Sequence, residues 1–114
     1  MTTREILVAA KAAAPYLAAA GTQIKNKALL AMADALVADT ESILLANEKD
    51  MEAAAGHVPQ VMLDRLALNE SRIQGMAEGI RQVAELPDPV GEVTDEFTRP
   101  NGMRIRKVRV PMGV

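Results

Sequence analysis

One interruption separates two different patterns in this chain. Residues 86–91 read LPDPVG, and two prolines and a glycine within six positions cannot continue a helix. Before this break the apolar residues recur at helical spacing, whereas after it two extended runs flank an Asn-Gly pair. We therefore expect a mostly α-helical chain with a helical region at 1–86, followed at 87–114 by a linker and a C-terminal antiparallel β-hairpin.

The helical region begins with a capping box. Thr2 and Glu5 have the spacing at which each side chain binds the backbone N–H of the other residue. Gly21 is placed to end this first helix, and Pro15 is expected to kink it because proline lacks a backbone donor and crowds the preceding turn. Four further helices are predicted to start at or near the following residues: Thr22, Thr40, Pro59 and Asn69.

Helical spacing also predicts which side chains face the core. On the second helix the apolar side is Ile24, Ala28, Ala31, Met32, Ala35 and Leu36. On the third helix the inward residues are Ile43, Leu44, Asn47 and Met51. On the last helix the buried stripe is Ile73, Met76, Ala77, Ile80, Val83 and Ala84. Gly75 and Gly79 also lie in that helix, and the close approach of a neighbouring helix is the favoured reason for glycines there.

The hairpin is predicted from two extended runs, 92–99 and 103–110. A two-residue type I′ turn at Asn101-Gly102 fixes the register, because both residue types tolerate positive φ. The opposed pairs are then Glu96 with Lys107, Phe97 with Arg106 and Val93 with Val110. The apolar positions change parity between Ile105 and Val108, which indicates a bulge or a change of neighbours there.

Composition limits both the core and the setting of the chain. Its 114 residues are 49% hydrophobic, which suits one small domain, but much of this is alanine and the aromatic residues are only Tyr16 and Phe97. Such a thin core predicts a need for partner surface. The net charge of −2 gives no overall attraction to nucleic acid or to an anionic membrane, and no uncharged stretch is long enough to span a bilayer. Without a secretory signal pattern, a cytoplasmic setting is expected.

The residues that carry catalytic or metal chemistry are few. The chain has no cysteine and a single histidine, His57, so a zinc site is not expected, and the serines Ser42 and Ser71 lie inside predicted helices. Neither the dinucleotide-binding glycine pattern nor the phosphate-binding loop pattern occurs. Carboxylate pairs such as Glu48 with Asp50 indicate solvated charge. No catalytic, cofactor-binding or metal-binding residue is therefore assigned within 1–114.

A basic run near the end allows two interpretations. Five of the thirteen basic residues lie within eleven positions: Arg99, Arg104, Arg106, Lys107 and Arg109. A phosphate-contacting ribbon is one interpretation. However, four acidic residues precede the run and neutralise much of its field across the hairpin: Asp88, Glu92, Asp95 and Glu96. Pairing within the chain or between subunits is therefore favoured over nucleic-acid binding.

Four stretches carry a resemblance to a known family. They are LLAMADAL, ILLANEKDMEAA, LDRLALNESRIQGMAEGIRQVAELPDPVGEV and NGMRIRKVRVPMGV, and together they cover nearly the whole chain. In this order and at these spacings, they resemble the N-terminal part of the gamma-glutamyl phosphate reductases, which belong to the aldehyde dehydrogenase superfamily. The resemblance implies an α/β parent fold, with this chain as a helical N-terminal portion whose last strand leads into a nucleotide-binding domain beyond Val114.

The resemblance also implies an activity for the longer protein. Enzymes of this family are cytoplasmic reductases of proline biosynthesis that use NADPH to convert the small molecule L-glutamyl 5-phosphate into L-glutamate 5-semialdehyde and phosphate. Their catalytic cysteine would lie beyond Val114, so this chain alone is predicted to be inactive and to bind no NADP(H). Homo-oligomer formation through the hairpin at 92–110 is expected, with no nucleic-acid or membrane partner. The alternative is a stand-alone helical interaction or dimerisation module without chemistry.

Overall fold

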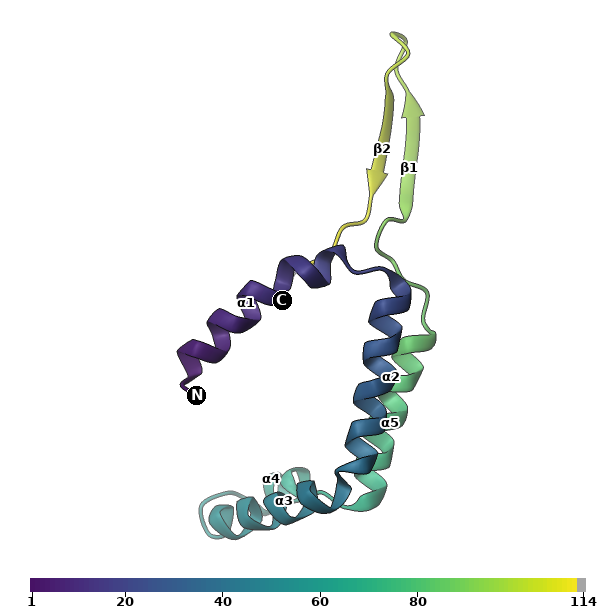
Figure 1. Cartoon of the computed structure of the whole chain (residues 1–114). Coiled ribbons are helices and arrows are strands. Elements are labelled where there is room, and N and C mark those ends of the chain that lie inside the picture. Colours follow the sequence, from purple (N-terminus) through teal and green to yellow (C-terminus); the bar gives the residue numbers. More distant parts are fainter. Residues whose placement is uncertain (113–114) are drawn as a thin grey trace. The chain divides into compact units, whose positions relative to one another are not determined.

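The computed structural model describes residues 1–112 of the chain and confirms a mostly helical protein with a two-stranded antiparallel hairpin (Figure 1). Within these residues the elements are α1 (Thr3–Ala19), α2 (Thr22–Ala38), α3 (Thr40–Ala54), α4 (Gln60–Leu66), α5 (Glu70–Glu85), β1 (Val93–Thr98) and β2 (Arg104–Val108). The predicted break at 86–91 separates α5 from β1. Residues 113 and 114 of the predicted hairpin region lie outside the described residues. The chain forms two compact units: one spans Lys25–Leu86, and the other joins Met1–Ile24 to the segment from Pro87 onward.

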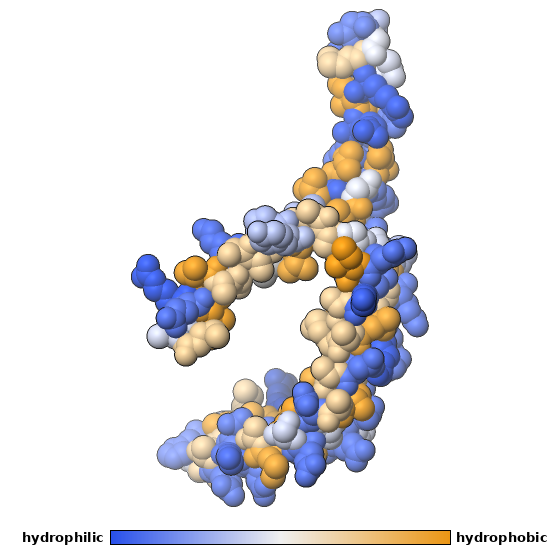
Figure 2. All heavy atoms as spheres, in the orientation of Figure 1, coloured by the Kyte–Doolittle hydropathy of each residue, from blue (hydrophilic) through white to orange (hydrophobic). Residues whose placement is uncertain are grey.

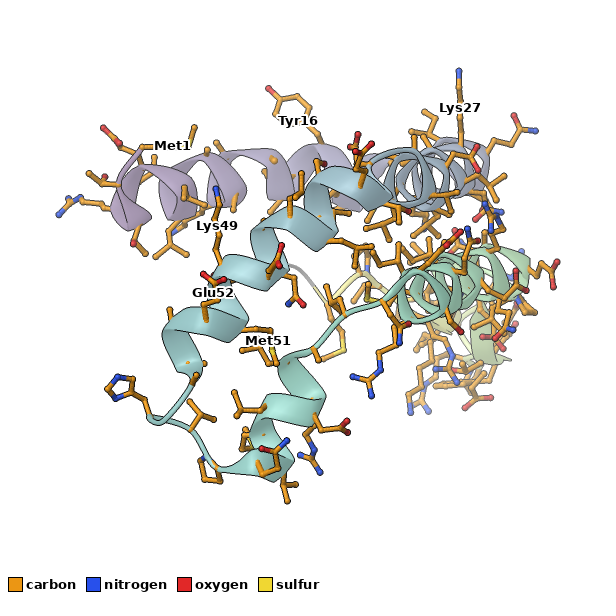
Figure 3. The ribbon with its side chains drawn as sticks, turned by 90° about the horizontal axis from the view of Figure 1, so that it is seen from below. Met1, Tyr16, Lys27, Lys49, Met51 and Glu52 are labelled. Carbon is orange, nitrogen blue, oxygen red and sulfur yellow. The ribbon has the colours of Figure 1, made fainter. Side chains whose placement is uncertain are left out.

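The core of the Lys25–Leu86 unit lies where α2 and α5 run side by side (Figures 1 and 3). Ala33 of α2 and both Ile73 and Ala77 of α5 have no solvent-exposed surface. Full burial of a side chain such as Ile73 stabilises a fold by about 1.5–3 kcal/mol. At the edge of this contact, Arg81 Nη2 lies 3.0 Å from Asp34 Oδ1 and joins α5 to α2.

The predicted inward face of α2 is wrong at most of its positions. Ile24 and Met32 are 66% and 54% exposed, and Ala28, Ala31 and Ala35 are exposed as well. The side that packs carries buried Ala33 and three half-buried residues: Leu29, Leu36 and Val37. Alanine and larger apolar residues occupy more than one side of this helix, so spacing alone could not select the side that a neighbour covers.

The helix α5 confirms its predicted cap and most of its predicted stripe. The Asn69 side chain accepts a hydrogen bond of 2.8 Å from the Arg72 N–H, as the sequence predicted for an N-cap. Ile73 and Ala77 are buried, and Ile80 and Ala84 are half-buried. Met76 and Val83, which were predicted to be buried, are 42% and 52% exposed. The neighbours of α5 thus cover a narrower arc than the apolar residues occupy.

The close approach of a neighbouring helix, which was predicted to explain Gly75 and Gly79, is not found among the described residues. A Cβ atom built at either glycine meets no heavy atom within 4 Å among the described residues. No neighbouring helix of the described chain therefore approaches α5 closely at these positions. Both glycines are exposed on the side of α5 away from Ile73.

The predicted inward residues of α3 are confirmed. Asn47 is buried, and Ile43, Leu44 and Met51 are half-buried. After α3 the chain turns at Gly56, whose φ of 79° lies in the left-handed region that suits glycine. The next helix, α4, begins at Gln60, so Pro59 occupies its N-cap position.

The capping box at the start of α1 is confirmed. The Thr2 N–H donates to Glu5 Oε2 at 2.7 Å, and the Glu5 N–H donates to Thr2 Oγ1 at 3.3 Å. Pro15 lies inside the helix, and the kink predicted there stays a prediction. No residue of α1 is buried. The helix is thus formed by local interactions while its apolar side chains stay exposed.

The hairpin forms where it was predicted, but its turn and register differ from the prediction. Paired residues include Phe97 with Ile105 and Thr98 with Arg104, a shift of one residue from the predicted pairing. The Gly102 N–H donates to the Arg99 carbonyl at 2.9 Å, and the Arg99 N–H donates to the Met103 carbonyl at 2.8 Å. Among residues 1–112 only glycines have positive φ, including Gly102 at 86°, so a type I′ turn at Asn101-Gly102 is excluded.

Proline accounts for the turn that forms instead. Pro100 fixes its own φ near −65°, which suits the second position of a type I turn, and Gly102 follows in the left-handed region. This three-residue loop moves the opposed pairs from Asp95 to Thr98 by one position relative to a two-residue loop. Val93 moves by two positions and pairs with Val108 instead of the predicted Val110. The one-residue shift brings Asp95 opposite Lys107 and Glu96 opposite Arg106.

An irregularity near the base of the hairpin matches the predicted change of parity. The register shifts between Val93 and Asp95, so the extra residue lies on β1 and faces the step from Lys107 to Val108. The Thr94 hydroxyl donates to the Lys107 carbonyl at 3.2 Å at this point. An acidic strand still pairs with a basic one, as predicted, although individual partners differ.

Candidate functional site

The serine and histidine side chains considered as candidate catalytic or metal-binding residues do not come together in a site. Within the described part of the chain, each of them either hydrogen-bonds the local backbone or is exposed without a partner. The Ser42 hydroxyl donates to the Asp39 carbonyl at 2.9 Å, at the start of α3. The His57 side chain is exposed in the connection between α3 and α4, and it forms no side-chain hydrogen bond within residues 1–112. No group of three or more potential metal ligands occurs among the described residues. None of the helices in the described part is long and apolar enough to cross a membrane.

One groove of the Lys25–Leu86 unit lies between α3 and the connection from α4 to α5. It has a volume of about 530 Å³ and is lined by Glu41, Leu44, Leu45, Asn47, Glu48, Met51, Ala67, Leu68, Asn69 and Glu70, and we call it the acidic groove. Its lining combines leucine, methionine and alanine side chains with three glutamates. Figure 3 shows Met51 turned toward the connection, whereas Lys49 and Glu52 lie on the other side of α3.

Asn47 holds the two walls of this groove together. Its Nδ2 donates to the Leu66 carbonyl at 2.9 Å, and its Oδ1 accepts from the Leu68 N–H at 2.8 Å. Both polar groups of the amide are therefore satisfied, although only 9% of the residue is exposed. One side chain on α3 thus fixes the backbone that leads from α4 into α5.

Arg72 reinforces the same connection from the α5 side. Its Nη1 donates to the backbone carbonyls of Asp64 and Ala67, and its Nη2 lies 3.6 Å from Asp64 Oδ2. These carbonyls lie at the C-terminal end of α4, where carbonyl groups lack partners within the helix. A guanidinium that binds both of them therefore stabilises the short helix and the turn after it. The groove wall at Ala67–Glu70 is therefore a defined backbone and not a loose loop.

A second apolar groove, of about 370 Å³, is lined by Met32, Ala35, Leu36, Asp39, Ser42, Ile43 and Ile80. It includes part of the α2 face that was predicted to be inward. Figure 2 shows hydrophobic residues along the visible sides of α1 and α2. The exposed apolar residues of α1 include Ile6, Leu7 and Leu17, each at least 51% exposed. Apolar surface of this extent marks sites where other protein surface packs.

Sequence reasoning missed the acidic groove, although part of its signal was readable. Glu41, Leu44, Leu45 and Glu48 follow i, i+3, i+4, i+7 spacing, which places two glutamates and two leucines on one side of a helix. Glu70 comes from a segment more than twenty residues further on, and only the fold brings it to the same groove. The prediction that no residue here is catalytic stays a prediction.

Comparison with known proteins gives a consistent result over nearly the whole chain. No protein-family model matches the chain. A gamma-glutamyl phosphate reductase of Neisseria meningitidis is 55% identical over 112 residues, which is 98% of this chain and 27% of that protein. One from Moorella thermoacetica is 57% identical over 106 residues, which is 92% of this chain and 25% of that protein. The chain matches the gamma-glutamyl phosphate reductases.

Solved structures of gamma-glutamyl phosphate reductases agree with the fold. The crystal structure from Thermotoga maritima superposes with a TM-score of 0.85 at 43% identity, covering 90% of this chain and 25% of that one. The structure from Saccharomyces cerevisiae gives a TM-score of 0.84 at 30% identity, covering 97% and 29%. The chain spans about a quarter of the length of the gamma-glutamyl phosphate reductases that it matches.

Proposed function

We propose that this chain is part of an NADPH-dependent reductase that converts L-glutamyl 5-phosphate into L-glutamate 5-semialdehyde and phosphate in proline biosynthesis. The observation that carries the proposal is 55% identity over 98% of the chain to a protein named gamma-glutamyl phosphate reductase. The proposed parent is a cytoplasmic enzyme with an aldehyde dehydrogenase-like α/β fold. Residues 1–86 form its N-terminal helical region, and 87–114 lead into its nucleotide-binding domain.

The acidic groove does not fit NADP(H). The dinucleotide carries phosphate groups, and the three glutamates that line the acidic groove repel them. The sequence has no glycine loop of the kind that wraps a pyrophosphate. The proposed cofactor and the catalytic cysteine therefore belong to other parts of the parent enzyme.

The contribution of this chain to the parent is packing surface. α1 buries none of its own side chains, and the exposed side of α2 carries Ile24 and Met32. We place the remainder of the parent enzyme against these faces, because burying them stabilises a larger domain by about 25 cal/mol per Å² of apolar area. The helices then support a reaction whose reactive groups come from elsewhere.

We further propose that the hairpin at 92–110 joins two copies of the protein. A two-stranded hairpin is marginally stable alone, and its outer edges carry backbone donors and acceptors that can pair with another strand. Every residue of β1 and β2 is exposed, including Phe97 and Ile105. A partner surface would bury these apolar side chains.

An NADPH oxidation assay with L-glutamyl 5-phosphate tests the activity. The 114-residue chain is expected to show no turnover, whereas the longer protein that contains this segment oxidises NADPH and forms the semialdehyde. In that protein Leu17→Asp should abolish activity through loss of packing, while the same change in the 114-residue chain should leave its unfolding midpoint unchanged. Turnover by the purified 114-residue chain, or none by the longer protein, would contradict the proposal.

Sedimentation velocity of the 114-residue chain tests the hairpin. Arg106→Pro with Val108→Pro removes two backbone donors from the outer edge of β2 and should weaken self-association. The control is Val61→Ala, because the Val61 side chain on α4 is exposed. Ile6→Pro is not used as a control, because a proline there would break α1. Unchanged association of the double proline variant would show that the hairpin is not the contact.

A further inference from the structure

We propose that Asn101 is a site of spontaneous deamidation and that the turn of the hairpin controls the rate of the reaction. The asparagines of the chain are Asn26, Asn47, Asn69 and Asn101, and only Asn101 is followed by a glycine. Both Asn101 and Gly102 are exposed. The co-reactant is water, so this modification is independent of the proposed reductase activity.

The reaction is the attack of a backbone nitrogen on the preceding side chain. The Gly102 nitrogen loses its proton to a solvent base and bonds to Asn101 Cγ, and the Cγ–Nδ2 bond breaks with release of ammonia. Water then opens the cyclic imide at one of its two carbonyl carbons. Opening at Cγ leaves aspartate, whereas opening at the backbone carbonyl carbon leaves isoaspartate, whose main chain runs through Cγ. The net change replaces an amide nitrogen by a water oxygen, and nothing is oxidised or reduced.

The surroundings of Gly102 favour this attack. Glycine has no Cβ, and even a Cβ built at this position meets no heavy atom within 4 Å among the described residues. Residues 99–104 include two arginines and no carboxylate, and positive charge favours loss of a proton from the attacking nitrogen. By contrast, lysine or glutamate follows each of the other asparagines, so a side chain crowds the nitrogen there. Asn101 is therefore expected to react fastest.

The folded turn holds both reacting groups in other contacts. The Gly102 N–H donates to the Arg99 carbonyl at 2.9 Å, so the attacking nitrogen is engaged in closing the turn. Asn101 Oδ1 accepts a hydrogen bond of 3.1 Å from the Met103 N–H, which fixes the orientation of the side chain. Both contacts must break before Cγ and the nitrogen reach an attack geometry. The reaction therefore proceeds from the opened turn.

The opened turn is accessible because the hairpin has few supports. Every residue of β1 and β2 is exposed, and elements of this kind open locally at little cost in free energy. The aspartate product keeps an oxygen that can accept from the Met103 N–H. Isoaspartate lengthens the main chain and separates the Gly102 N–H from the Arg99 carbonyl. Deamidation thus adds a negative charge at the turn and, in its isoaspartate form, weakens the hairpin.

Peptide mapping after incubation in neutral buffer tests the site. Products are identified by the mass gain of each asparagine-containing peptide and by labelling with an isoaspartyl methyltransferase. In the 114-residue chain and in the longer protein that contains it, Asn101 should react about tenfold or more faster than any other asparagine. Reaction of Asn101 no faster than that of the others, in either protein, would overturn the site.

The same measurement in urea separates the chemistry from its control by the turn. Unfolding the 114-residue chain should speed the reaction at Asn101 by about tenfold, because the turn is then open in every molecule. Gly102→Ala should slow the reaction in urea, because a Cβ hinders the attacking nitrogen. An equal rate at Asn101 in native buffer and in urea would overturn control by the turn, and an unchanged rate in Gly102→Ala would overturn the attack by that nitrogen.

A proline variant tests the turn in the folded chain. Pro100→Ala should speed the reaction in native buffer by about two- to fivefold, because the turn loses the residue that presets its φ. The rate in urea should stay the same. The matched control is Pro59→Ala, which makes the same change before α4 and should alter neither rate. No increase in Pro100→Ala, or an equal increase in Pro59→Ala, would show that the turn does not set the rate.

Discussion

The helices α1 and α5 are similar in length and capping but differ in how much of each helix is buried. They have 17 and 16 residues, and each begins with a side-chain cap that binds backbone N–H groups. Yet α5 buries Ile73 and Ala77, whereas α1 buries no residue. Local capping therefore accounts for the existence of both helices, and neighbours account for the burial of only one. Within the described residues, α1 is therefore a capped helix whose apolar side chains remain exposed.

The largest test of this comparison is the removal of a core side chain. Ile73→Ala should lower the free energy of unfolding by about 2–5 kcal/mol, because it leaves a cavity between α2 and α5. Ile6→Ala on α1 should change it by less than about 0.5 kcal/mol, since Ile6 is already exposed. Urea unfolding followed by helical circular dichroism measures both. Equal effects would mean that α1 is packed as well as α5.

The next test removes the link between α3 and the start of α5. Asn47→Ala should cost about 2 kcal/mol, because the Leu66 carbonyl and the Leu68 N–H lose their partners away from water. Asn47→Asp sharpens the test, because an ionised carboxylate still accepts from Leu68 but repels the Leu66 carbonyl. Its folded-state pKa is thus raised, and the variant should gain stability as pH falls through that pKa. A pH-independent loss would show that the Leu66 contact contributes little.

Glycines give a test of intermediate size. Gly79→Ala should raise the stability of the 114-residue chain by about 0.5–1 kcal/mol, because the added methyl group meets open space and alanine favours helices. Gly102→Ala should lower hairpin stability by about 1–2 kcal/mol, because its φ of 86° is unfavourable for alanine. Backbone amide exchange locates both effects. If Gly79→Ala inactivates the longer protein while it stabilises this chain, a partner backbone approaches α5 there.

The smallest effect concerns the cap of α1. The Thr2 N–H, and secondly the Thr2 hydroxyl, hydrogen-bond the Glu5 carboxylate and lower its pKa. Because the folded-state pKa is the lower one, the stabilisation is present above the unfolded-state pKa and is lost as pH falls through the folded one. An NMR titration of the Glu5 carboxyl carbon should show this lowered pKa, and Thr2→Pro, which removes the backbone N–H as well as the hydroxyl, should move it back toward its ordinary value. An unchanged titration in that variant would exclude the capping box as the cause.

Some of the candidate site could be read in advance, and some could not. The helical spacing of Glu41, Leu44 and Glu48 lies in the sequence, and so does the basic run that includes Arg106. The placement of Glu70 in the same groove could not be read, because it depends on the turn that Asn47 and Arg72 hold in place. The sequence contains two competing signals for the hairpin register. Pro100 favours a type I turn, whereas the Asn101-Gly102 pair favours a two-residue type I′ turn, and the structure contains the turn that Pro100 favours.

By itself the sequence determined the features whose causes lie within about four residues along the chain. These are the capping box at Thr2, the cap at Asn69, the helix break at 86–91 and the presence of a hairpin. Only the tertiary structure decided which side of α2 is buried, which apolar residues of α5 stay exposed, and which glutamates share a groove. The physical reason is that burial is a property of two surfaces, whereas a cap or a break is complete within one segment.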